Sequence, residues 1–127
     1  MIARYTQANP PYQPLLLDAL PPVVEPAYER GQTLAERFAA FHAANPHVLT
    51  ALRELALRLR RRGVKHYGIA ALFEVLRFES MIRTADPDGW KLNNSYRSFY
   101  SRLLMAQCAE LDGFFETRTS AADTVLQ

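Results

Sequence analysis

Apolar residues recur every three or four positions through the central and C-terminal parts of the chain, a pattern that predicts four helices. The first helix begins at a capping box, in which the Thr33 hydroxyl accepts from the Glu36 backbone and the Glu36 carboxylate reaches back. Asn45 and Pro46 end it and begin the second helix, with the asparagine as N-cap and the proline in the first helical position. Gly63 is expected to cap the end of this second helix.

The third helix is predicted over residues 69–83 and the fourth over residues 94–109, with Gly113 as a later break. A loop rich in Asp, Pro and Gly separates these two helices. One side of the fourth helix is expected to pack in the core, with the tyrosine hydroxyls hydrogen-bonded: Tyr96, Phe99, Tyr100 and Leu103. Trp90, in the loop before this helix, is expected to plug the core, the alternative being contact with a partner.

Residues 64–67 and 114–117 each have the composition of a short strand, although a turn is the alternative for the first of them. The order of helices followed by a strand that starts at a glycine is similar to a winged helix-turn-helix. The connection over residues 84–93 is longer than the usual turn of that motif, and residues 119–127 make a poor second strand. The predicted fold is mainly α, a four-helix, winged-helix-like domain.

Residues 1–32 differ in composition from the rest, because they hold six of the eight prolines together with many apolar residues. Proline excludes a long helix here. We expect an extended N-terminal arm that packs on its own domain or on a partner. The predicted organisation is therefore an arm (residues 1–32), a helical domain (residues 33–118) and a flexible tail (residues 119–127).

The charge is uneven along the chain, although the formal net charge is only +2. Residues 47–66 hold six basic residues against the single acid Glu54, a local net charge of +5. Residues 104–127 have a local net charge of −3, with Arg118 as their one basic residue. The basic segment can attract an anionic partner, while the alternative is a solvated helix end favoured by the helix dipole.

The polar side of the fourth helix combines short polar residues with arginines, as in helices that lie in a DNA major groove. We expect base contacts from Asn94, Arg97, Ser98 and Ser101. Phosphates would be held by basic residues of this helix, the preceding loop and the basic segment: Arg102, Lys91, Arg61, Arg62 and Lys65. The alternative is an ordinary solvated face that binds nothing.

Signals for an enzyme are poor. The three histidines lack metal-ligand spacing, and the five glycines are too scattered for a phosphate-binding loop. Cys108 is the single cysteine, so no intrachain disulfide can form, and this fits a reducing compartment. We expect Cys108 to be a small buried residue. Glu74 and Glu79 are expected to pair with Arg77 or Arg83 at helical spacing. We expect a soluble, cytoplasmic protein without cofactor, metal or membrane span.

Several short segments together resemble small uncharacterised proteins encoded by bacteriophages and prophages: residues 44–48, 67–69, 72–77, 91–94 and 113–118. The resemblance covers roughly residues 38–118 and transfers no binding or catalytic residue. It implies that the protein comes from a phage or a bacterium and works inside the bacterial host cell. The preferred hypothesis is a non-catalytic, regulatory protein that binds duplex DNA, with a homodimer as a possibility. The alternative is a phage-type protein-interaction module that binds or inhibits a bacterial host protein.

Overall fold

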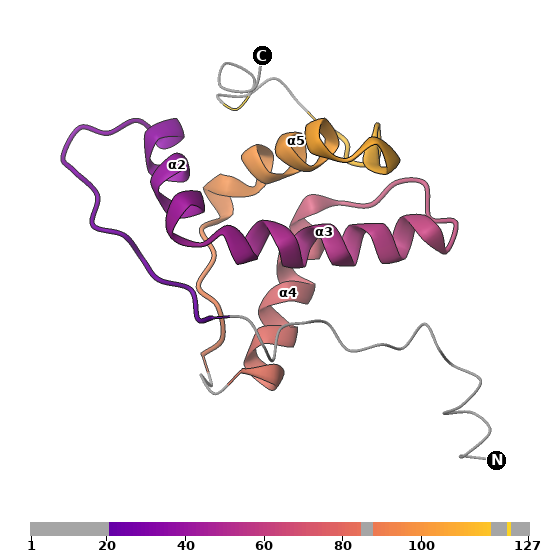
Figure 1. Ribbon diagram of the computed structural model, residues 1–127, viewed down its shortest axis with the longest axis horizontal. Helices are drawn as coiled ribbons and strands as arrows, with labels where there is room; N and C mark the ends of the chain where they lie inside the picture. Colours follow the sequence, from indigo (N-terminus) through magenta and orange to yellow (C-terminus); the bar gives the residue numbers. More distant parts are fainter. Residues whose placement is uncertain (1–20, 85–87, 118–121, 123–127) are drawn as a thin grey trace.

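The computed structural model describes residues 21–84, 88–117 and 122. Within them the chain forms the helices α2 (Leu34–Ala44), α3 (Pro46–Arg61), α4 (Ile69–Arg83) and α5 (Arg97–Gln107), as Figure 1 shows. Two short 3-10 helices flank α5, η2 (Asn94–Tyr96) before it and η3 (Ala109–Leu111) after it. The protein is therefore mainly helical, as the periodicity predicts.

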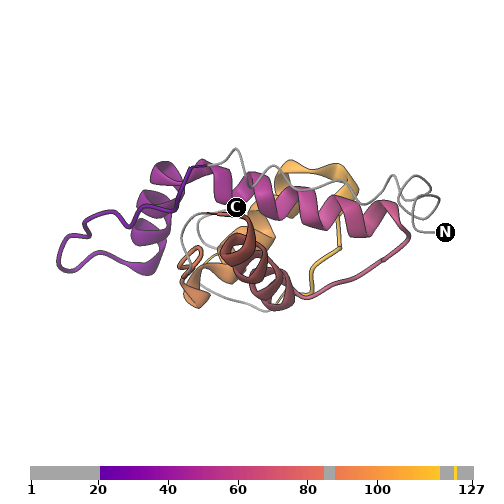
Figure 2. The ribbon, with the colours of Figure 1, turned by 90° about the horizontal axis from the view of Figure 1, so that it is seen from below.

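Helix α3 is the longest and runs across the molecule, with contacts to α2, α4, α5 and η3 (Figure 1). Seen from below, α4 lies beside α3 and points nearly along the line of sight (Figure 2). Helices α4 and α5 also contact each other. One apolar core thus lies between α3, α4 and α5, and α2 closes one end of it.

Aromatic rings fill the centre of this core. Phe38 of α2 stacks on Phe99 of α5 at 4.8 Å between ring centroids and meets Tyr100 edge-on at 4.9 Å. Tyr96, Phe99 and Tyr100 are all essentially unexposed, so the predicted inner side of the fourth helix is confirmed. Trp90 is also buried, at 3% exposure, and this confirms its predicted place beneath the loop.

Several predicted helix ends are confirmed by their hydrogen bonds. The Thr33 backbone donates to the Glu36 carboxylate at 2.8 Å and the Thr33 hydroxyl accepts from the Glu36 backbone at 3.1 Å, which completes the capping box. Gly63 has a φ of +99° and closes α3, while the next amide, of Val64, donates to the Leu59 carbonyl at 3.0 Å. Helix α4 has the predicted bounds.

Asn45 has a different role from the predicted one. It precedes α3, but its side chain makes no capping bond there. Its amide instead accepts from the Val24 backbone N–H at 2.7 Å, and donates to the Val24 carbonyl at 2.7 Å and to the Phe41 carbonyl at 3.0 Å. A wholly buried asparagine side chain therefore holds the arm against the corner between α2 and α3.

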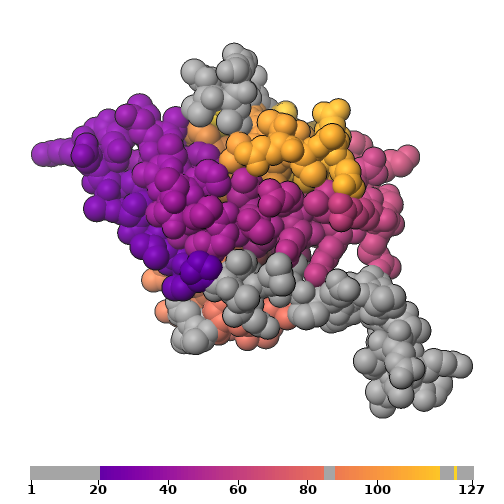
Figure 3. Space-filling view, in the orientation of Figure 1, coloured from indigo at the N-terminus to yellow at the C-terminus, as the bar shows by residue number. Residues whose placement is uncertain are grey.

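The described part of the arm lies against its own domain, as Figure 3 shows for the segment that follows residue 20. The hydroxyl of Tyr96 donates to the Tyr28 oxygen at 3.1 Å, which adds a second attachment. The hydroxyl of Tyr100 is buried and has no partner among the described residues, so the prediction of a satisfied hydroxyl is wrong for this tyrosine. Residues 1–20 and most of the predicted tail lie outside the described residues.

The described residues contain no β-strand. The two segments expected to be short strands do meet, because the Tyr67 backbone N–H donates to the Phe114 carbonyl at 3.2 Å. A single bond does not make a ladder, and the side chains of both Phe114 and Phe115 are buried instead of alternating between two faces. The helical part of the predicted architecture is shown, and its wing is not.

The fourth helix also ends earlier than predicted. Helix α5 stops at Gln107, and Cys108 takes an extended conformation with φ −126° and ψ 107°. The chain then turns through η3, which places Leu111 and Phe114 in the core. Burial of these two side chains overrides the continued helical pattern. None of the described helices is long and apolar enough to cross a membrane.

Candidate nucleic-acid interface

The polar side of α5 lines an open groove of ≈ 590 Å³. The opposite wall comes from Ile69 and Ala70, at the start of α4, and from Glu116 and Thr117. The wall on the α5 side contains five of the nine residues predicted to bind nucleic acid, together with Ser95: Asn94, Arg97, Ser98, Ser101 and Arg102. The structure thus brings the predicted polar side together at one site, which we call the α5 groove.

Two guanidinium groups give the α5 groove its positive charge. The Arg97 Nε donates to the Asn94 carbonyl at 3.0 Å, and Arg102 Nη1 donates to the Ser98 carbonyl at 3.2 Å. These bonds run back to the helix that carries the arginines, so both side chains lie along the helix and are half-buried. Each guanidinium has five N–H donors, and the bond of Arg97 to the Asn94 carbonyl uses one of the five that Arg97 carries.

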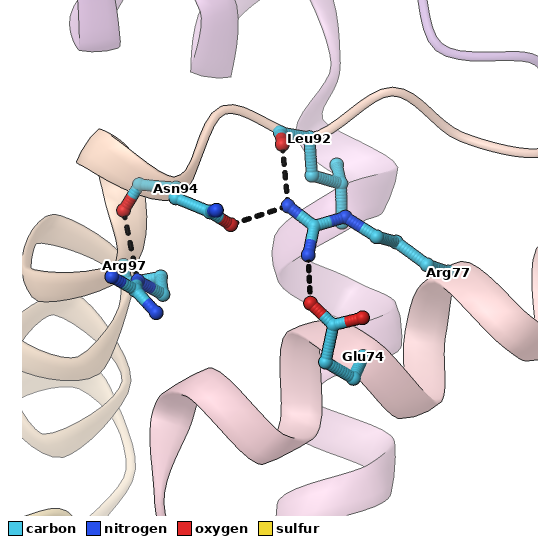
Figure 4. Close-up of polar contacts among 5 residues, drawn as sticks. All are labelled: Glu74, Arg77, Leu92, Asn94 and Arg97. Carbon is cyan, nitrogen blue, oxygen red and sulfur yellow. Dashed lines mark hydrogen bonds and ion pairs between the residues drawn. The ribbon is translucent and has the colours of Figure 1, made fainter.

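Arg77 of α4 organises the entrance to α5 (Figure 4). Its Nη2 donates to the Leu92 carbonyl at 2.7 Å and to the amide oxygen of Asn94 at 2.5 Å, while its Nη1 pairs with Glu74. Pairing of an asparagine with adenine uses both the oxygen and the nitrogen of the amide. Because the Asn94 oxygen already accepts from Arg77, the predicted adenine contact would either share this oxygen with Arg77 or break that bond.

The rest of the predicted base-reading side is recessed. Ser101 is 1% exposed, and its hydroxyl donates to the Ser98 carbonyl at 3.0 Å. Ser98 is half-buried. Ser101 is therefore recessed and does not stand on the predicted outward face, whereas Ser98 remains partly exposed in the α5 groove. A ligand would have to enter the α5 groove instead.

The four remaining predicted residues do not line this groove. Arg61 forms a two-pronged ion pair with Glu110 of η3, at 2.7 Å and 3.0 Å. The same contact holds the pKa of the exposed Glu110 carboxyl below its usual range. Arg62 and Lys65 are exposed near the end of α3. Lys91 lines a separate hollow of ≈ 460 Å³, beside Trp90 and Glu25.

The pairing of Arg61 with Glu110 explains why the sequence overestimates the positive charge that residues 47–66 offer to an anionic partner. The basic segment and the acidic C-terminal segment lie far apart in the sequence but meet in the fold, where Arg60 also donates to the Glu110 carbonyl at 3.3 Å. Part of the positive charge is thereby neutralised inside the protein. Glu110 uses two of the five N–H donors of Arg61, and its negative charge opposes the approach of a phosphate to this arginine.

Sequence reasoning missed the opposite wall of the groove. Glu116 and Thr117 reach it because the segment after Gly113 runs beside the start of α4, a long-range contact with no local signal. Ser95 lies within the polar run and was predictable from its position next to Asn94. The role of Arg77 between two helices was also missed, although its pairing with Glu74, and that of Arg83 with Glu79, are confirmed.

The described residues hold no group of three or more histidine, cysteine, aspartate or glutamate side chains placed to bind a metal ion. Comparison of the chain with protein-family models, curated proteins and solved structures gives no match.

Proposed function

We propose that the protein is a non-catalytic nucleic-acid-binding protein that holds a stretch of sugar-phosphate backbone in the α5 groove. The observation that carries the proposal is the presence of two arginines and a set of short polar side chains in one open groove. Arginine matches phosphate in geometry as well as charge, and hydroxyl and amide groups commonly bond to phosphate and sugar oxygens. A regulatory role in a phage or bacterial setting would follow from the resemblance in the sequence.

Binding in this mode differs from that of a winged helix. There the recognition helix enters the DNA groove and the wing touches the backbone. Here the backbone of the nucleic acid would enter a groove of the protein, and Asn94 and Ser95 at its mouth are exposed toward a ligand. A wing would have to involve residues 118–127, most of which lie outside the described residues, and the proposal does not need one.

Glu116 provides a test of whether the ligand of the α5 groove is negatively charged. Among the described residues it is the one acid that lines the α5 groove, and it would repel a phosphate. Glu116→Gln should therefore strengthen oligonucleotide binding, most clearly at low salt. A ligand that carries a positive charge would respond in the opposite direction.

The main experiment measures binding of labelled single-stranded and duplex oligonucleotides over a range of salt concentrations. The double variant Arg97→Ala with Arg102→Ala should weaken binding and make the salt dependence shallower by about one to two counterions. The matched control removes the same charge from exposed positions outside the groove, with Arg30→Ala and Arg37→Ala. Equal losses in both double variants, or no salt-sensitive binding at micromolar concentration, would refute the groove as a nucleic-acid site.

The second candidate is a protein-interaction module, favoured by the exposure of Phe78 and Ile82 on α4, at 55% and 65%. The arm, which suggested this function in the sequence, is attached to its own domain over its described part. Capture of a bacterial protein that depends on Phe78, with no oligonucleotide binding, would favour this candidate.

A further inference from the structure

Helix α4 is apolar on the side that faces away from the core as well as on the side that faces it. Its inner side buries Leu72, Phe73 and Leu76. On the outer side Phe78, Met81 and Ile82 are 55%, 45% and 65% exposed, and these are three of the five large hydrophobic residues that the described part of the chain exposes. A helix that is apolar all round is normally covered on both sides.

The outer residues form a regular seam. Ala71, Val75, Phe78 and Ile82 follow one another at steps of four, three and four, the spacing of the a and d positions at which one helix packs against another. The seam extends over about 16 Å of the helix axis at 1.5 Å per residue. We call these four residues the α4 seam.

We propose that a second copy of this chain covers the α4 seam, with the two α4 helices antiparallel about a two-fold axis between positions 76 and 77. In this register Ala71 faces the partner's Ile82, and Val75 faces the partner's Phe78. Each small side chain thus lies opposite a large one, so the two helices can approach closely without a void. The seam is complementary to its own reversed copy, which is what a two-fold interface requires.

The flanking charges select the antiparallel direction. In a parallel pair, a residue just before an a position faces the residue five places later on the partner helix. Glu74 and Glu79 stand in that relation, so a parallel dimer would oppose two carboxylates twice. In the antiparallel register Glu74 lies nearest the partner's Met81, and Glu79 lies level with the partner's Leu72, whose side chain is buried in its own core. No two like charges then meet beside the seam.

This interface rests on observations separate from those behind the nucleic-acid proposal. The α4 seam points away from the core, whereas Ile69 and Ala70 at the start of α4 line the α5 groove. A dimer would carry two such grooves related by the two-fold axis. Failure of either proposal leaves the other intact, because one concerns self-association and the other concerns oligonucleotide binding.

Sedimentation of the full chain over a wide concentration range tests the dimer. We expect a reversible monomer–dimer equilibrium, with Phe78→Glu raising the dissociation constant at least about tenfold. Val24→Glu is the matched control, because Val24 is 56% exposed but lies outside α4. A monomer at all concentrations, or equal effects of the two substitutions, would overturn the proposal. Capture of a foreign protein by a chain that stays monomeric would assign the seam to that protein instead.

Engineered cysteines test the direction of the helices in a Cys108→Ser background. Ala71→Cys mixed with Ile82→Cys should form the mixed disulfide under oxidised glutathione, because the two positions face each other. Either variant alone should cross-link poorly, since the two copies of one position then lie about 16 Å apart along the seam. Cross-linking of each variant with itself, but not of the mixture, would refute the antiparallel register.

Discussion

The Arg77 guanidinium donates to the amide oxygen of Asn94 at 2.5 Å, and this bond fixes the start of α5 to the middle of α4. The same Nη2 atom donates to the Leu92 carbonyl at 2.7 Å, so one side chain orders both the loop and the first turn (Figure 4). The arginine side chain is only 23% exposed, which shields these bonds from water. Arg77 thus positions one wall of the α5 groove from outside it.

Replacement of Arg77 by methionine should lower the free energy of unfolding by about 1.5–3 kcal/mol, the usual range for hydrogen bonds to a charged group. Arg77→Lys should recover only part of this, because an ammonium group lacks the planar fork whose one nitrogen reaches the Leu92 and Asn94 oxygens while the other pairs with Glu74. Urea denaturation of both variants measures the effect. A lysine variant as stable as the natural chain would contradict it.

A double-mutant cycle of Arg77→Met with Asn94→Ala isolates the bond between these two side chains. We expect the double variant to be more stable than the sum of the single losses predicts, by about 0.5 kcal/mol or more. Purely additive losses would mean that the bond between Arg77 and Asn94 contributes nothing, and that the Leu92 carbonyl and Glu74 account for the effect of Arg77.

The helices were predictable because their signals are local. The bounds of α4 follow from apolar periodicity alone, and the capping box at Thr33 needs only residues within one turn. The loss of the predicted strand at 114–117 has a different origin, since Phe114 and Phe115 are buried by residues far away in the sequence. The composition of a short segment does not indicate burial by residues that are distant in the sequence.

The candidate site was predictable in part for the same reason. Helical spacing places the α5 residues on one side, but it cannot tell an open side from the wall of a groove. Ser101 is buried because the start of α4 and residues 116–117 lie opposite it. Likewise the run of arginines at the end of α3 gives no sign that Glu110 will pair with Arg61. Long-range contacts decide both outcomes.

The arm should come loose from the domain when Asn45 is replaced by alanine. Its amide makes three hydrogen bonds, two to the Val24 backbone and one to the Phe41 carbonyl. Loss of a fully buried amide that satisfies three backbone groups should cost about 2–4 kcal/mol. Hydrogen exchange at the Val24 amide should rise more than at amides in the middle of α3. An unchanged exchange rate at Val24 would show that the arm is held elsewhere.

Gly89 should tolerate a methyl group far less well than Gly63. Both have a positive φ, +67° and +99°, so alanine is strained at either position. At Gly89 the new methyl would lie 2.7 Å from the Ser80 hydroxyl and 2.7 Å from the Met81 side chain, whereas at Gly63 it meets nothing within 4 Å. Gly63→Ala should cost about 1–2 kcal/mol. Gly89→Ala should cost about 1–3 kcal/mol more. Equal melting temperatures would contradict this difference.

Two histidines, the partly buried His42 and the buried His47, should make the protein less stable as the pH falls. Burial lowers the pKa of His42 and of His47 from the ordinary value of 6.5, so both prefer to be neutral in the folded state. As the pH falls through 6.5, the unfolded chain takes up protons that the folded chain does not. The free energy of unfolding should therefore decrease, by up to about 1.4 kcal/mol per pH unit for each histidine, until the pH reaches the lowered pKa.

The variant His42→Phe separates the contribution of His42 to this pH dependence from that of His47. The His42 ring stacks on Phe38 at 5.8 Å with an angle of 5° between the planes, and its Nδ1 has no partner among the described residues. Phenylalanine keeps the stacked ring and removes the titrating group. Urea denaturation from about pH 7.5 to pH 5 should give a shallower decline for the variant than for the natural chain. Equal slopes would show that His42 does not contribute, and a flat profile in both would exclude His47 as well.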